Sequence, residues 1–148
     1  MASLRLTGVT SELTRAQQFL AQWWGDHRLS DVERFPFDLA LEELFINVAS
    51  YARDETGAPC HVEISLTQSD ASSDGGKDIS HRNVILVIKD NGPAFDPISM
   101  KGPDLDGNLQ TKEIGGLGIH LTRSVMDSID YEYKDGHNRV SIAKKINS

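Results

Sequence analysis

The chain has 148 residues, a length that suits one domain with a real hydrophobic core, so we expect a single stand-alone domain over residues 1–148. A hydrophobic fraction of 39% and a charged fraction of 25% are typical of a soluble globular protein. The formal charge of -7 repels phosphate backbones and disfavours direct nucleic-acid binding. Cys60 is the only cysteine, and no apolar run predicts a signal peptide or a membrane span, so we expect a cytoplasmic protein that does not bind membranes.

The N-terminal third predicts one strand and two helices. Apolar residues favour a short strand over residues 4–9 and an amphipathic helix over residues 10–25. Pro36 fits the first turn of a second helix, which meets no helix breaker before Gly57.

The remaining chain predicts four strands and one helix. Residues 60–66 alternate as a strand, and residues 83–89 are apolar enough for a strand buried on both faces. Between them, residues 68–81 are rich in Ser, Asp and Gly and predict a mobile hairpin loop. A helix and a hairpin around Asp135-Gly136-His137-Asn138 complete the pattern, over residues 117–126, 128–133 and 140–146. We expect an α+β fold, a two-layer α/β sandwich whose mixed, mainly antiparallel sheet is covered on one face by helices.

Glu43 and Asn47 form a first signature on the second predicted helix. Side chains four residues apart project from one face of a helix, so both can reach one bound group. An amide oxygen suits a magnesium ion shared with phosphates, and a carboxylate can accept a proton from an attacking hydroxyl. Glu42 points about 100° away, so Glu43 is the better candidate. The alternative is an ordinary solvated helix face.

Asp90-Asn91-Gly92 is a second signature, directly after the most apolar strand. A carboxylate is costly there unless it has a partner, and the exocyclic amine of adenine is a suitable donor. Gly92 lacks a side chain and lets the backbone approach a flat base. The alternative is a plain Asp-Asn-Gly turn.

A third signature, a glycine box, precedes the last predicted helix. Exposed amides at a helix N-terminus can face phosphate oxygens, aided by the helix dipole. The alternative is close helix packing through the glycines. The box lacks the Lys-Ser/Thr ending of a P-loop, and its residues are Gly115, Gly116, Leu117 and Gly118.

The connection that leads to the glycine box, about residues 97–114, has no core pattern, and a long connection of this kind is often functional. Its cations are Lys101 and Lys112, and either can meet a phosphate as a mobile point charge.

The order of the three signatures resembles the GHKL ATPase superfamily and, within it, the small serine-kinase anti-sigma factors. The most specific part is Gly-Gly-Leu-Gly-Ile-His-Leu-Thr-Arg-Ser-Val-Met-Asp. The resemblance implies a Bergerat-type ATP-binding fold with an ATP lid at about residues 97–114. It also implies site roles: catalytic base for Glu43, Mg²⁺ ligand for Asn47, adenine contacts for Asp90 and Gly92, and phosphate contacts for Lys112 and the glycine box.

The same resemblance implies an ATP-dependent serine/threonine protein kinase that acts as an anti-sigma factor. Such a kinase sequesters a sigma factor and phosphorylates a small antagonist of the STAS type, and a homodimer is expected. The alternative is a non-catalytic ATP-binding regulatory module that inhibits a partner by sequestration. The carboxylate at Glu43 favours catalysis over that alternative.

Overall fold

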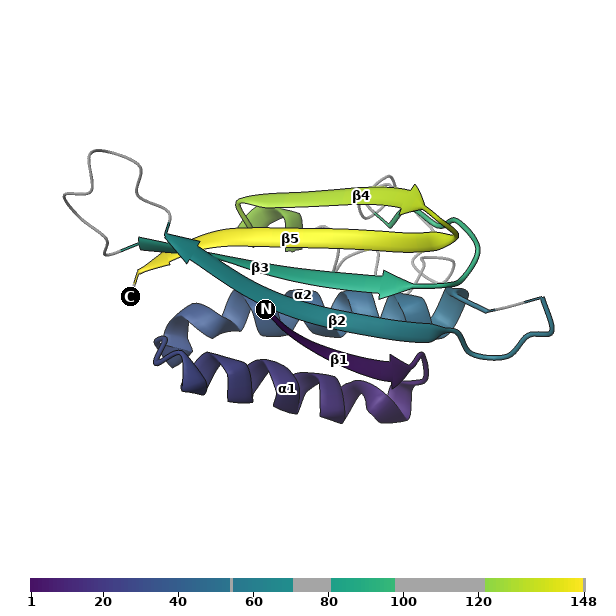
Figure 1. Ribbon diagram of the computed structural model, residues 1–148, viewed down its shortest axis with the longest axis horizontal. Coiled ribbons are helices and arrows are strands. Elements are labelled where there is room, and N and C mark those ends of the chain that lie inside the picture. The colour runs from purple at the N-terminus through teal and green to yellow at the C-terminus, as the bar shows by residue number, and fades with distance from the viewer. Residues whose placement is uncertain (54, 71–80, 98–121, 148) are drawn as a thin grey trace, which may run out of the picture.

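The computed structural model describes residues 1–53, 55–70, 81–97 and 122–147 (Figure 1). One short strand is followed by two consecutive helices, then by two long strands, and an antiparallel hairpin closes the chain. The elements are β1 (Ala2–Thr7), η1 (Thr10–Glu12), α1 (Leu13–Asp26), α2 (Asp31–Tyr51), β2 (His61–Asp70), β3 (His81–Asp90), β4 (Ser128–Lys134) and β5 (His137–Asn147).

One five-stranded sheet has the order β1-β2-β3-β5-β4, and α1 and α2 lie on one of its faces (Figure 1). The α+β sandwich expected from the sequence is therefore confirmed. Every neighbouring pair of described strands is antiparallel, so the parallel pairing of a mixed sheet is not found among them.

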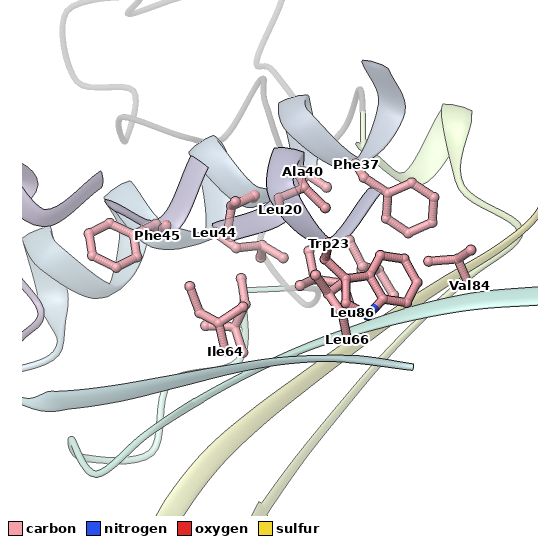
Figure 2. Close-up of a cluster of buried hydrophobic side chains, with 14 of the residues drawn as sticks. Leu20, Trp23, Phe37, Ala40, Leu44, Phe45, Ile64, Leu66, Val84 and Leu86 are labelled. Carbon is pink, nitrogen blue, oxygen red and sulfur yellow. The ribbon is translucent and has the colours of Figure 1, made fainter. Parts of the chain in front are cut away.

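The core fills the space between this sheet and the helices (Figure 2). Alternate strand residues point toward the helices because side chains in a strand alternate between faces. Ile64, Ile88 and Val140 form one such cross-strand row, and all three are buried. Trp24 and Phe37 pack against each other above the sheet, with ring centroids 5.3 Å apart. Burial of each large side chain contributes roughly 1.5–3 kcal/mol, which holds α2 over β3 and β5.

α2 begins earlier than the sequence suggested. Ser30 is extended and Asp31 starts the helix, with Asp31 and Glu33 placed in the first turn, where negative charge favours the helix dipole. Pro36 lies inside the helix, so its expected place in the first turn was wrong. The helix tolerates the missing backbone donor because the following turns carry much of the core. No helix in the described ranges is long and apolar enough to cross a membrane.

The two central strands are longer than expected. β2 continues to Asp70 and β3 starts at His81, so the predicted loop over residues 68–81 overlaps strand at both ends. Its middle, residues 71–80, lies outside the described residues. For the predicted helix over residues 117–126, residues 122–125 are helical, and residues 117–121 lie outside the described part.

The C-terminal hairpin is confirmed, with a tighter turn than expected. Asp135 and Gly136 have φ values of 55° and 76°, as a two-residue turn of type I′ requires. His137 and Asn138 were expected in the turn but belong to β5. As a result, Asn138 lies directly opposite Asp90 on β3.

Candidate functional site

A small pocket lies between the C-terminal half of α2, the end of β3 and the start of β5. Its lining is mostly apolar with a few convergent polar groups, as is typical of small-molecule sites. The polar lining residues are Asn47, Asp90 and Asn138. The others are Leu44, Val48, Ala52, Ile88, Phe95, Pro97 and Val140.

Asp90 is a buried carboxylate on the sheet side of this pocket. Its Oδ1 accepts hydrogen bonds from the backbone N–H of Gly92 at 2.9 Å and from the Asn138 amide at 3.0 Å. Among the described residues both side-chain bonds of Asp90 go to Oδ1, which leaves Oδ2 as an acceptor for a ligand. Burial raises the pKa of Asp90, while the bonds from Asn138 and Gly92 and the charge of His137 lower it. The site thus offers one oriented acceptor, as an adenine amine requires.

Gly92 is required by the packing of the turn that follows β3. A Cβ atom at this position would lie 2.9 Å from the Cβ of Ala52, 3.0 Å from Asp90 Oδ1 and 3.1 Å from Cys60 Sγ. These contacts are too short for any residue with a side chain. The sequence pointed to a close approach of a ligand, whereas the structure gives a protein-side reason for the glycine. A contact between Gly92 and a base stays a prediction.

Asn47 and Glu43 form the helix side of the site, and each has buried side-chain atoms without a hydrogen-bond partner. Asn47 is 2% exposed, and neither its Oδ1 nor its Nδ2 has a hydrogen-bond partner. Glu43 Oε2 is also buried without a partner. Each unsatisfied buried group costs roughly 1–3 kcal/mol. Unpaired buried atoms of this kind are typical of a binding site in which the bound ligand supplies the missing partners. The amide oxygen of Asn47 is a suitable ligand for a hard cation such as Mg²⁺.

Glu43 lies one turn before Asn47, about 6 Å along the axis of α2, and outside the residues that line the pocket. Burial, and secondarily the charge of Glu42, raises the pKa of Glu43. Glu42 itself is exposed. Of the two glutamates, Glu43 is therefore the less exposed, and its role as the catalytic base stays a prediction.

Asn138 is the site residue that sequence reasoning missed. It is 3% exposed and makes hydrogen bonds to Asp90, to the turn after β3 and to Tyr131. The Asp135-Gly136 turn fixes the register of β5 against β4, whereas Asn138 meets Asp90 through the pairing of β5 with β3, for which the sequence carries no local signal. Phe95 stacks on Tyr51 with ring centroids 5.2 Å apart at the pocket wall.

The expected phosphate-binding residues lie outside the described residues, as does the expected lid after Pro97. Their roles remain predictions. The expected phosphate-binding residues are Lys112, Gly115, Gly116, Leu117 and Gly118.

Comparison with known proteins agrees with this geometry. The family described as "Histidine kinase-like ATPase domain" matches residues 9–144. The chain is also similar to the "Serine/threonine-protein kinase BtrW" of Bordetella bronchiseptica, with 31% identity over 127 residues, which cover 82% of this chain and 81% of that protein. The family match spans both walls of the pocket and nearly the whole chain. The chain therefore belongs to the histidine kinase-like ATPase domain family.

Proposed function

We propose that this chain is an ATP-dependent serine/threonine protein kinase that acts as an anti-sigma factor and phosphorylates a STAS-type antagonist. The observation that carries the proposal is the arrangement of polar groups around one apolar pocket. Asp90 supplies an oriented buried acceptor, and Asn47 and Glu43 keep buried atoms unpaired on the facing helix. Membership of an ATPase domain family and similarity to a protein named a serine/threonine kinase support it.

In this proposal each pocket residue acts on one part of ATP. Asp90 Oδ2 accepts a hydrogen bond from the adenine amine, while Asn138 and Gly92 hold Oδ1. Asn47 would hold Mg²⁺ through its unpaired amide oxygen, and the cation would supply positive charge that stabilises the phosphates. ATP supplies the phosphoryl group that is transferred. Lys112 and the glycine box would complete the phosphate contacts.

Glu43 is the proposed base for the acceptor hydroxyl. It shares a helix face with Asn47, so a hydroxyl that approaches the phosphates from the side of α2 meets this carboxylate. Burial raises its pKa, which makes the carboxylate a stronger proton acceptor than an exposed one. Glu43 therefore orients the hydroxyl and takes its proton.

The partners follow from the family resemblance. A sigma factor would be sequestered by the chain, and phosphorylation of the STAS-type antagonist would prevent its release. A homodimer and a lid over residues 97–114 are parts of the same proposal. The competing function is an ATP-binding module that inhibits a partner without phosphoryl transfer.

Glu43→Gln tests transfer against binding, with Glu42→Gln as a matched control on the next, exposed residue. Transfer from radiolabelled ATP to a purified STAS-domain protein should fall by about 10²- to 10⁴-fold in Glu43→Gln, the usual contribution of a positioned acid or base. Glu42→Gln should stay within a few fold of the parent, and ATP affinity should survive in both. An unaltered transfer rate in Glu43→Gln would exclude it as the base, and a parent that binds ATP but transfers nothing would favour the binding module.

A further inference from the structure

Asn138 joins three segments around Asp90. Its Nδ2 donates to Asp90 Oδ1 at 3.0 Å, to the Pro93 carbonyl at 2.8 Å and, more weakly, to the Gly92 carbonyl at 3.3 Å. One amide thus ties the start of β5 to the end of β3 and to the turn after it. Because Asn138 is buried, water does not compete for these bonds.

The other end of the same amide fixes its orientation. Asn138 Oδ1 accepts from the backbone N–H of Phe95 at 2.9 Å and from the hydroxyl of Tyr131. A flipped amide would place NH₂ against the N–H of Phe95 and oxygen against a carboxylate and two carbonyls. The neighbours therefore permit one orientation, in which Nδ2 faces Asp90.

We propose that Asn138 is a positioning residue that sets purine specificity, because it holds Asp90 as a hydrogen-bond acceptor and so selects a 6-amino purine over a 6-oxo purine. The inference rests on the proposed ATP site and deepens it. With Oδ1 occupied by Asn138 and Gly92, Oδ2 is the oxygen of Asp90 that remains for a ligand. That oxygen attracts the amine of adenine and repels the carbonyl oxygen at the same position of hypoxanthine.

Without Asn138 this selection should weaken. Burial already favours the neutral form of Asp90, and the bond from Asn138 is the largest influence that lowers its pKa. A protonated Asp90 donates a hydrogen bond. It can therefore bind the carbonyl oxygen of a 6-oxo purine, and it loses the hydrogen bond from a 6-amino group. Other titratable groups near the pair, within the described part of the chain, are His137 on β5, Tyr131 on β4 and Asp96 after β3.

The test compares ADP with IDP, which differ at purine position 6. Calorimetry at pH 6 and pH 8 would use the parent, Asn138→Asp and Asn138→Ala. Asn138→Asp places a second carboxyl group against Asp90 Oδ1, so the two share a proton. We expect the parent to prefer ADP by roughly 10-fold or more, and Asn138→Asp to lose most of that preference, more at pH 6 than at pH 8. Asn138→Ala should change in the same direction by less.

Tyr131→Phe keeps the test decisive if the Asn138 variants do not fold. It removes one of the two donors to Asn138 Oδ1 and leaves the ring in place. The ADP preference should fall about 2- to 3-fold, and a carbon-13 titration of the nucleotide-free protein should show Asp90 with a higher pKa than in the parent.

Three results would overturn the inference. An equal loss of ADP and IDP affinity at both pH values would make Asn138 a purely structural residue. An unchanged preference in the folded variants, with the Asp90 pKa also unchanged, would remove the proposed link. A parent that binds neither nucleotide would overturn the ATP site together with this inference, whereas a parent that binds ADP leaves the first two results to refute the inference alone.

Discussion

Asn47→Leu should make the nucleotide-free protein more stable while it damages nucleotide binding. The substitution removes two buried polar atoms without partners, beside the apolar side chains of Leu44 and Val48 in the pocket wall. Release of one unsatisfied amide should raise the free energy of unfolding by about 1–3 kcal/mol. For a chain of this length that corresponds to a rise in melting temperature of roughly 3–9 °C. Urea and thermal unfolding without nucleotide measure the change.

Asn138→Leu is the matched control, because both residues are buried asparagines in the same pocket. The Asn138 amide is fully hydrogen-bonded. Its removal takes away one donor to Asp90 and leaves the Phe95 N–H and the Pro93 carbonyl without this partner. We expect a loss of about 3–5 kcal/mol. Saturating ATP with Mg²⁺ at 100 times its dissociation constant should stabilise the parent by about 2.7 kcal/mol and Asn47→Leu by far less. If Asn47→Leu destabilises the protein as Asn138→Leu does, Asn47 has a structural role and the argument from its unpaired atoms is refuted.

Three further outcomes follow from the same contacts. Gly92→Ala should lower stability by about 1–3 kcal/mol and weaken ADP binding, because the new methyl group meets Ala52 and Asp90; urea unfolding and calorimetry check both. Asp90→Asn should weaken ADP binding by roughly 10-fold or more, since an amide replaces the carboxylate acceptor, and equal affinity by calorimetry would contradict this. Glu43→Gln should be more stable than the parent at neutral pH. A raised pKa means that the folded parent binds the proton more tightly, so its carboxylate destabilises the fold above the unfolded-state pKa; unfolding curves should show the difference shrinking as pH falls and vanishing below about pH 4.

Periodicity predicted the elements of this fold better than their ends. β3 and the C-terminal hairpin were recognisable because apolar runs and an Asp-Gly turn are local signals. The start of α2 was missed because Pro36 is a typical first-turn residue, while the helix gains enough from its buried face to continue through it. The strand ends at residues 68–70 and 81 were not predicted, because polar residues there join the sheet through backbone pairing with neighbouring strands. Composition does not reveal such pairing.

The site residues that could be predicted are those whose chemistry is visible in the local sequence. A carboxylate after an apolar strand and an amide four residues from a glutamate are visible in a sequence, and the structure brings Asp90 and Asn47 to one pocket. Asn138 was not predictable in this way, because its role depends on strand register and on bonds to residues 43 to 48 positions away in the sequence. The packing reason for Gly92 likewise depends on Ala52 and Cys60, which approach it only in the folded chain.

The two walls of the pocket differ in a way that bears on mechanism. On the sheet side, Asp90 and Asn138 satisfy each other before any ligand arrives, so the shape and polarity offered to a base are preorganised. On the helix side, Asn47 lines the pocket and Glu43 lies one turn before it, and both have buried polar atoms without partners, which costs stability in the nucleotide-free state. A site built only for tight binding of a base would need the first wall alone. The second wall has a use when a cation and a reacting hydroxyl complete it, so the unpaired atoms of α2 support the proposed phosphoryl transfer more strongly than the proposed adenine contact of Asp90 does.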